Sequence, residues 1–168
     1  MARMPRLVVA GYPHHVTQRG NRRMQTFFCD EDYQAYIDIL KESLEESLNE
    51  IWAYCLMPNH VHLIVVPQVE DGLSALFRQV HRNYSRRINF REKWRGHLWQ
   101  ERFHSFVMSE QHLMIGVRYV ELNPVRARLC DRPEDWRWSS AQDHLGLRES
   151  DFVKIKPMLD RVPDWKRY

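Results

Sequence analysis

The pattern of apolar and polar positions predicts a strand followed by a helix at the start of the chain. Residues 12–19 (YPHHVTQR) alternate in polarity and include β-branched side chains, which is typical of a strand, and Gly20-Asn21 ends it. Apolar residues from Tyr33 to Leu48 then recur at steps of three and four, which indicates an amphipathic helix. Asp30 is a good N-cap ahead of this pattern, so the helix should begin there.

A hairpin and a second helix should follow. Residues 51–56 and 60–66 are apolar runs of strand length. Met57-Pro58-Asn59 between them is a tight turn, since proline presets φ and asparagine tolerates unusual backbone angles, so the two strands should pair antiparallel. Residues 72–90 repeat apolar side chains at helical spacing and carry arginines four residues apart along another side.

A fourth strand and a third helix complete the predicted fold. Residues 94–99 are predicted as a loop and residues 102–108 as a strand. Ser109 caps a helix that should end near Asn123, because Pro124 follows. The order β-α-β-β-α-β predicts an α+β fold of the ferredoxin-like or RRM-like kind, with two helices on one face of an antiparallel sheet. The third helix is an addition to that unit.

The length of 168 residues fits a single domain. We expect residues 1–146 to form it and residues 147–168 to be a tail that packs on the domain or trails from it. We expect no membrane span and no signal peptide. The cysteines are odd in number and show no C-x-x-C spacing, so we expect neither a disulfide framework nor a structural zinc site, and a reducing cytoplasm is the expected location. These cysteines are Cys29, Cys55 and Cys130.

The net charge of +3 hides an uneven distribution along the chain. Residues 30–50 hold eight carboxylates and one lysine, whereas residues 78–102 hold eight arginines and lysines and two glutamates. Such segregation fits either a charged, solvated surface or a face that binds phosphates. Composition alone leaves both interpretations open.

His60 and His62 are the first candidates for chemistry. One residue apart on a strand, their side chains leave the same face with α-carbons roughly 6.7 Å apart, so both imidazoles can converge on one metal ion. Histidines on a half-buried strand are also commonly satisfied by ordinary hydrogen bonds. The H-x-H spacing by itself therefore does not identify a metal site.

Tyr119 and Asn123 are the second pair of candidates. Four residues apart on the predicted third helix, they lie one turn apart on one side of it. They fall beside the apolar stripe of Leu113, Val117 and Val120, which should face the core. A tyrosine in such a place is ordinarily a packing residue with its hydroxyl at the surface, so the helix position alone does not reveal a function.

Several short motifs occur in order along nearly the whole chain. They are HHVTQRGNRR (14–23), MPNHVHL (57–63), GHLWQERFH (96–104), RYVELNPVRARL (118–129) and WRWSSAQDHLG (136–146). Together they resemble the ordered motifs of the single-tyrosine HUH transposases, and most of all the branch of REP-associated tyrosine transposases. Several spaced motifs are far more specific than any one of them.

This resemblance implies a site, a cofactor and a substrate. The family's nucleophilic tyrosine corresponds to Tyr119, its histidine pair to His60 and His62, and the polar metal ligand one helical turn after the tyrosine to Asn123. The resemblance also implies an RRM-like sheet, Mg²⁺ or Mn²⁺, and single-stranded DNA from hairpin-forming repeats as the partner. It favours a monomer over a homodimer. Imidazole ligands by themselves would favour zinc or manganese over magnesium.

Such residues are suited to cutting DNA and rejoining it without ATP. A tyrosine phenolate that attacks the scissile phosphorus in line leaves a 5′-phosphotyrosine and a free 3′-OH, which stores the energy of the broken bond. A divalent ion stabilises the charge that develops on the non-bridging oxygens. We therefore expect a sequence-specific, metal-dependent endonuclease and strand transferase that acts on single-stranded DNA.

The basic residues in and near these motifs are candidates for DNA binding. Arginines contact the phosphate backbone and position DNA, whereas aromatic rings interleaved with them can stack on unpaired bases. For Trp99 the sequence leaves open whether the ring stacks on bases or is buried against the sheet; for Phe103 burial is expected. The candidates for DNA binding are Arg19, Arg22, Arg23, Arg78, Arg82, Arg86, Trp99 and Arg102.

Other classes of function fit the sequence less well. A non-catalytic nucleic-acid-binding module would explain the basic stripe but not the coincidence of His60, His62, Tyr119 and Asn123, and the aromatic strand motif of an RRM is absent. A metal hydrolase of small phosphoesters should place a carboxylate beside the histidines, and none occurs there. A domesticated transposase that no longer moves an element remains compatible with the sequence.

Overall fold

The computed structural model describes residues 7–168. Strands and helices alternate through the first two thirds of the chain, and short helices follow. The main elements are β1 (His14–Arg19), α1 (Asp30–Ser47), β2 (Asn49–Met57), β3 (His60–Pro67), α2 (Gly72–Glu92), β4 (His104–Val107) and α3 (Glu110–Arg126). The short ones are η1 (Asn21–Arg23), η2 (Pro133–Asp135), α4 (Ala141–His144), α5 (Lys156–Leu159) and η3 (Trp165–Arg167).

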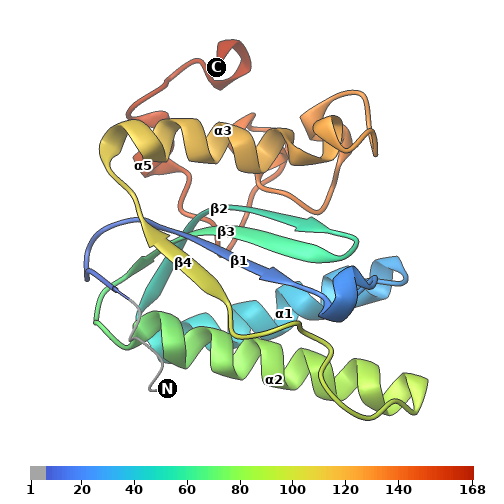
Figure 1. The fold of residues 1–168 in the computed structure, drawn as a ribbon. Coiled ribbons are helices and arrows are strands. Elements are labelled where there is room, and N and C mark those ends of the chain that lie inside the picture. The colour runs from blue at the N-terminus through green and yellow to red at the C-terminus, as the bar shows by residue number, and fades with distance from the viewer. Residues whose placement is uncertain (1–6) are drawn as a thin grey trace.

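The described residues form a four-stranded antiparallel sheet in the order β2-β3-β1-β4. The two strands that open the β-α-β halves, β1 and β3, lie side by side in the middle of it. This is the arrangement of the ferredoxin-like unit, and the α+β prediction is confirmed. Helices α1 and α2 cover one face of the sheet, and α3 crosses the other face (Figure 1).

Each face of the sheet has its own apolar core. On the α1–α2 side, Leu40, Leu76 and Phe77 pack with the inward side chains of β1 and β3. On the α3 side, Val117 and Val120 pack with Ala53 and Cys55 of β2. Helix α3 therefore contacts mainly β2 on its face of the sheet, and β3 less.

Helix α3 does not end before its proline, as the sequence predicted. It continues through Pro124 to Arg126. Proline removes only one hydrogen-bond donor near the end of a helix, and the final turn still closes because the Ala127 N–H donates to the carbonyl of Asn123. The Pro124 side chain is buried, so its packing offsets the lost bond. One consequence is that Asn123 lies inside the helix rather than at its end.

The strand predicted over residues 102–108 is shorter, since β4 covers only His104–Val107. Residues 99–101 follow β1 without becoming a strand. Gln100 N–H donates to the Arg19 carbonyl, and the Gln18 side chain donates to the carbonyl of Glu101. These isolated backbone and side-chain bonds take the place of a regular ladder, so the segment runs beside the end of β1 instead of extending β4.

The segment after α3 is attached to this helix by hydrogen bonds to a buried carboxylate. Glu121 of α3 accepts hydrogen bonds from Ser140 Oγ and His144 Nδ1 through one oxygen and from the Trp165 indole N–H through the other. A buried carboxylate needs such donors to offset the loss of its hydration. These bonds fasten residues near the C-terminal end of the chain to the helix that carries Tyr119.

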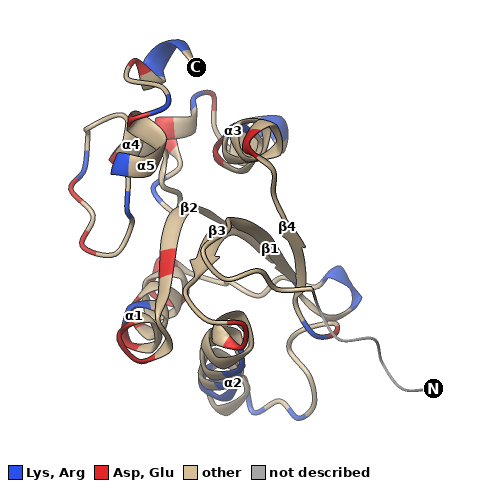
Figure 2. Cartoon of the chain, turned by 90° about the vertical axis from the view of Figure 1, so that its left-hand side faces the viewer, with Lys and Arg blue, Asp and Glu red and all other residues tan. Residues whose placement is uncertain are grey.

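Two neighbouring helices carry net charges of opposite sign. Carboxylates gather on α1 and arginines on α2, and the two helices pack side by side under the sheet (Figure 2). Within residues 7–168, no helix is long and apolar enough to cross a membrane.

Candidate active site

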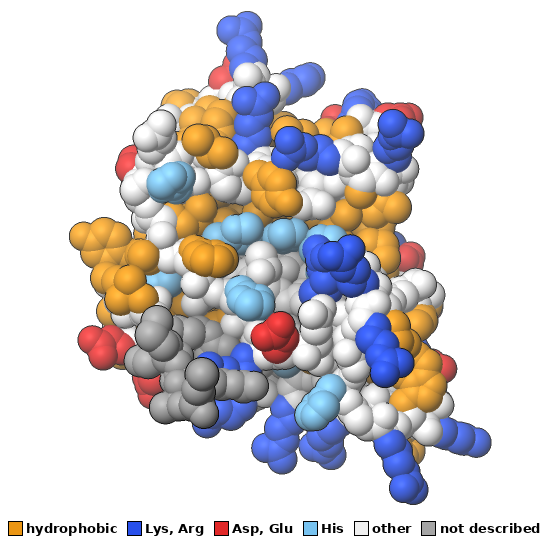
Figure 3. Space-filling model, in the orientation of Figure 1, with side chains coloured by type: hydrophobic (Ala, Val, Ile, Leu, Met, Phe, Trp, Pro, Cys, Tyr) orange, Lys and Arg blue, Asp and Glu red, His pale blue; other side chains and the backbone are white. Residues whose placement is uncertain are grey.

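The candidate site lies on the face of the sheet that α3 crosses. His60 and His62 project from β3 toward this face, opposite Arg19 and Thr17 of β1 in the strand register. Histidine side chains form a row along the seam beneath α3 (Figure 3). The period-two geometry of a strand explains why both members of the H-x-H pair reach the same seam.

The structure brings the four predicted catalytic and metal-binding residues together. The ring centroids of His60 and His62 lie 4.9 Å apart, and those of His62 and Tyr119 lie 5.7 Å apart. The Asn123 amide nitrogen lies 3.2 Å from Nε2 of His62. One helix and one strand of the same chain thus supply the whole cluster.

The hydrogen bonds of His60 and His62 are consistent with a proton on Nδ1 of each ring. Nδ1 of His60 lies 2.6 Å from Oδ1 of Asn59, and Nδ1 of His62 lies 3.0 Å from Nε2 of His15. If both Nδ1 atoms carry the proton and donate, each Nε2 keeps an unprotonated lone pair that can bind a cation, and in this structure the lone pair of His62 accepts from the Asn123 amide nitrogen. Outer hydrogen bonds of this kind fix ring orientation in metal sites.

Burial keeps both histidines neutral. Desolvation, followed by the nearby charge of Arg19, lowers the pKa of His60 to about 4. Desolvation, reinforced by the neighbouring His60, lowers the pKa of His62 to about 3. At pH 7 both rings are therefore unprotonated, which is the state that a metal ligand requires.

The donor set fits a weakly held divalent ion. No group of three or more His, Cys, Asp or Glu side chains able to hold a metal ion occurs within residues 7–168. The cluster instead offers two imidazoles and the amide of Asn123, whose nitrogen faces His62. Rotation of that amide would present its oxygen to a cation. With no anionic protein ligand, such a site leaves positions open for a phosphate.

Tyr119 is partly exposed beside the histidines. Its side chain is 41% exposed although its helix neighbour Asn123 is buried. The Tyr119 hydroxyl forms no hydrogen bond with the part of the chain that the structure describes. The guanidinium carbon of Arg126 lies 5.3 Å from the ring centroid of Tyr119, so a positive charge borders the tyrosine ring.

The predicted DNA-binding arginines fall into separate groups. Arg19 and Arg102 line a cavity of about 250 Å³ together with His60 and His62. Arg22 and Arg23 lie in η1 with φ of 54° and 61°. The remaining ones, Arg78, Arg82 and Arg86, lie along the exposed side of α2.

Trp99 and Phe103 are both largely buried, each 7% exposed. The Trp99 ring centroid lies 4.9 Å from that of His81, and the ring also packs near Tyr36 and Tyr84. Base stacking by Trp99 therefore remains a prediction, and an exposed aromatic residue would serve that role better.

In the sequence, Asn59 is marked only as a turn residue and His15 only as one of two adjacent strand histidines. Asn59 reads as a turn residue, yet its side chain both accepts from His60 and donates to the Arg23 carbonyl, which ties η1 to the β2–β3 turn. His15 is one of two adjacent strand histidines, and only the register of β1 against β3 places it beside His62. Neither contact leaves a signal in residue spacing.

The protein thus has an α+β, ferredoxin-like fold. Its candidate site combines an H-x-H strand with a tyrosine on the helix that crosses the sheet. The family model described as "Transposase IS200 like" matches residues 8–123, which include every residue of that site. The chain belongs to the IS200-like transposase family.

A curated relative agrees with this placement, and a solved structure shares the fold. A protein of Haemophilus influenzae described as a REP-associated tyrosine transposase is 25% identical over 136 residues, which cover 74% of this chain and 75% of the relative. A solved structure of a REP-associated tyrosine transposase bound to a REP hairpin has a TM-score of 0.74 at 20% identity and covers 92% of this chain and 98% of its own. At that identity the structural likeness supports the fold.

Proposed function

We propose that this protein is a metal-dependent transposase of the REP-associated type, which cuts and rejoins single-stranded DNA at hairpin-forming repeats. The observation that carries the proposal is the meeting of His60, His62, Asn123 and Tyr119 in one chain. The hairpin-bound relative supports the class of substrate. We further propose that residues 1–146 form the catalytic domain with 147–168 as its tail, and that the protein acts in the cytoplasm.

In the proposed reaction Tyr119 is the nucleophile. Its phenolic oxygen attacks the scissile phosphorus in line, a phosphorus–oxygen bond forms, and the bond to the 3′ oxygen breaks. The phenolic proton passes to solvent, and the departing 3′ oxygen gains a proton to become a hydroxyl. The product is a 5′-phosphotyrosine, and attack by a 3′-OH reverses the step and rejoins DNA.

The other site residues orient the phosphate and hold the cofactor. A divalent ion, Mg²⁺ or Mn²⁺, held by His60, His62 and Asn123 would draw charge from the non-bridging oxygens. Asn59 holds the His60 ring and His15 holds the His62 ring, in each case through a hydrogen bond to Nδ1 of the ring that is held. Arg19 and Arg102, in the same cavity, add positive charge beside the phosphate. Since one chain supplies every group, the proposal favours a monomer.

The proposal is tested by incubating the protein with end-labelled stem–loop oligonucleotides that carry unpaired flanks. With Mn²⁺ we expect a protein–DNA adduct that survives denaturation, and with excess EDTA we expect none. A protein that binds these oligonucleotides but never forms the adduct would be a non-catalytic nucleic-acid-binding module.

The arginines of α2 should dominate the salt dependence of DNA binding. Replacing Arg78, Arg82 and Arg86 with alanine removes three exposed guanidinium groups that form no ion pair with any residue in 7–168. Fewer counterions are then released from single-stranded DNA, so the slope of log affinity against log salt should fall by about 2. Fluorescence anisotropy across a salt series measures it.

A matched triple variant controls for net charge. Arg132, Arg137 and Arg167 are exposed but pair with Asp135, Asp30 and Asp164. Their replacement changes the net charge equally and should leave the slope nearly unchanged. Equal slopes in the two triple variants would show that α2 is only a solvated basic surface.

A further inference from the structure

The two halves of the candidate site come from different elements, so the position of α3 over the sheet decides whether they meet. His60 and His62 belong to β3, whereas Tyr119 and Asn123 belong to α3. Misplacement of reacting groups by about 1 Å can slow a reaction roughly 10²-fold. The apolar packing between α3 and β2 is non-directional, so by itself it allows the helix small rotations and shifts.

Glu121 lies between the two α3 residues of the site in sequence but on another side of the helix. It is two residues from Tyr119 and two from Asn123, which corresponds to a rotation of about 200° around an α-helix. Its side chain is therefore directed away from the histidines, and the residue is only 4% exposed. A rotation of α3 that displaced the Tyr119 ring would move the Glu121 carboxylate as well.

Three donors from the chain after α3 hold this carboxylate. Ser140 Oγ and Nδ1 of His144 each lie 2.6 Å from Oε1 of Glu121, and the Trp165 indole nitrogen lies 2.9 Å from Oε2. The His144 ring also stacks on Trp165, with 4.5 Å between ring centroids. Because hydrogen bonds are directional, donors on both oxygens fix the orientation of the carboxylate, which apolar contacts cannot do.

Ser140 connects Glu121 to the sheet. Its Oγ accepts from the Tyr54 N–H at 3.0 Å, and its own N–H donates to the Tyr54 carbonyl at 2.9 Å. Tyr54 precedes Cys55 on β2, and Cys55 is paired with His62 in the register of β2 against β3. One serine thus joins the helix that carries Tyr119 to the strand that lies beside His62.

A carboxylate is a costly residue for a buried position. Its loss of hydration must be offset by hydrogen bonds, whereas an apolar side chain of similar size would pack without that cost. Among residues 7–168, His144 is the only residue placed to form an ion pair with Glu121, and it does so only when protonated. What the carboxylate contributes beyond packing is a set of directed bonds between α3 and the rest of the fold.

We propose that Glu121 is a positioning residue, which sets the rotation of α3 so that Tyr119 and Asn123 face the histidines of β3, with Ser140 as its link to the sheet. The inference rests on the proposed function for the reaction that this alignment serves. In this proposal Glu121 contacts neither the DNA nor the metal ion, and it acts through the backbone of α3.

Two substitutions of similar size separate hydrogen bonding from charge and from packing. Glu121→Gln can keep all three bonds, because its carbonyl can accept from Trp165 while its amide nitrogen donates to Ser140 Oγ and to Nδ1 of His144 in the other tautomer. Glu121→Met packs but makes none of them. We expect the single-turnover rate of adduct formation to stay within about threefold of the wild type in Glu121→Gln and to fall roughly 10²-fold in Glu121→Met. Stem–loop affinity, measured in EDTA, should be unchanged in both.

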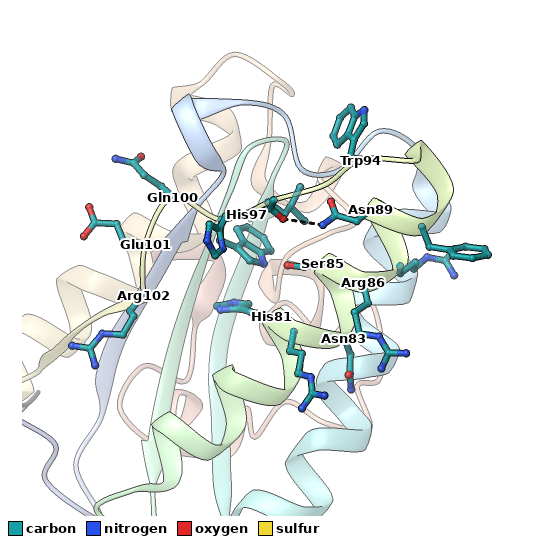
Figure 4. A pocket seen from close by; sticks show the side chains of 16 residues that line it. His81, Asn83, Ser85, Arg86, Asn89, Trp94, His97, Gln100, Glu101 and Arg102 are labelled. Atoms are coloured by element: carbon teal, nitrogen blue, oxygen red, sulfur yellow. Dashed lines mark hydrogen bonds between the residues drawn. The ribbon is translucent and has the colours of Figure 1, made fainter.

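A further variant and a control separate positioning from a general loss of stability. Ser140→Ala cuts the link to β2 but leaves the other two donors, and it should slow adduct formation about tenfold. Tyr36→Phe removes a buried hydroxyl that is bonded to His81, which Figure 4 shows on α2, the helix on the opposite face of the sheet. It should lower the unfolding temperature but leave the rate unchanged. If Glu121→Met does not fold, a wild-type rate in Ser140→Ala would by itself overturn the proposal.

Crystal structures of the two Glu121 variants supply a measurement that does not depend on activity. The Asn123 amide should stay within hydrogen-bond distance of His62 in Glu121→Gln and move away from it in Glu121→Met. An unmoved amide or an unchanged rate in Glu121→Met would overturn the proposal, and so would an equally slow Glu121→Gln. A wild-type protein that forms no adduct, together with the expected movement of Asn123, would instead contradict the enzyme activity alone.

Discussion

Tyr119→Phe is expected to abolish the denaturation-resistant protein–DNA adduct while leaving DNA binding within about threefold of the wild type. The substitution removes one oxygen atom, the only atom of the side chain able to attack phosphorus. The ring remains to contact His62 and Arg126. Gel analysis of labelled DNA after denaturation measures the adduct, and anisotropy measures the binding.

The fold should tolerate this change. The Tyr119 hydroxyl has no hydrogen-bond partner among residues 7–168, and its side chain is 41% exposed, so no buried group loses a partner. Tyr12→Phe is the matched control, since Tyr12 is an exposed tyrosine outside the histidine–tyrosine cluster, and it should keep full adduct formation. An adduct that persists in Tyr119→Phe would mean that another residue is the nucleophile.

His62→Ala is the second substitution with a large expected effect. We expect adduct formation to fall by at least about 10²–10³-fold, the usual loss when a transition-state stabilising group is removed. His62 is the imidazole that contacts both Asn123 and His15, so its loss dismantles the donor set. Hairpin affinity should change little, because the metal serves the transition state more than ground-state recognition.

Two further variants make this result interpretable. His60→Ala, at a half-buried histidine, should lose activity to a similar extent with less effect on packing. His104→Ala, at an exposed histidine that lines the same cavity, should stay active. Thermal unfolding checks that each variant is folded. Near-normal activity of folded His60→Ala and His62→Ala would contradict the proposed metal site.

Local periodicity was enough to predict most of the fold. The alternation in β1 and the helical spacing in α1 and α2 are set by burial on one face, which the sequence displays directly. The period of two along β3 likewise placed His60 and His62 on one face, and the spacing of four placed Tyr119 and Asn123 on one side of α3. Each of these inferences concerns a single element.

What could not be predicted depends on contacts between distant elements. The docking of α3 on the open face of the sheet follows from the packing of Val117 and Val120 on β2, and the histidine cluster follows from that docking. The prediction that α3 ends before Pro124 was wrong, because packing and the remaining hydrogen bonds of the last turn offset the bond that proline removes. The partnership of His15 with His62 required the register of β1 against β3.

The most direct test of the central claim is to locate the covalent bond itself. Wild-type protein trapped on a stem–loop substrate with Mn²⁺ is digested with nuclease and trypsin, and the peptides are analysed by mass spectrometry. Trypsin cleaves after Arg118 and Arg126, so the proposed nucleophile lies in the peptide YVELNPVR, which contains no other tyrosine. We predict that this peptide carries the added mass of a nucleotide, joined through its 5′-phosphate to Tyr119. Nucleotide on any other residue, or a joined 3′-phosphate, would contradict it.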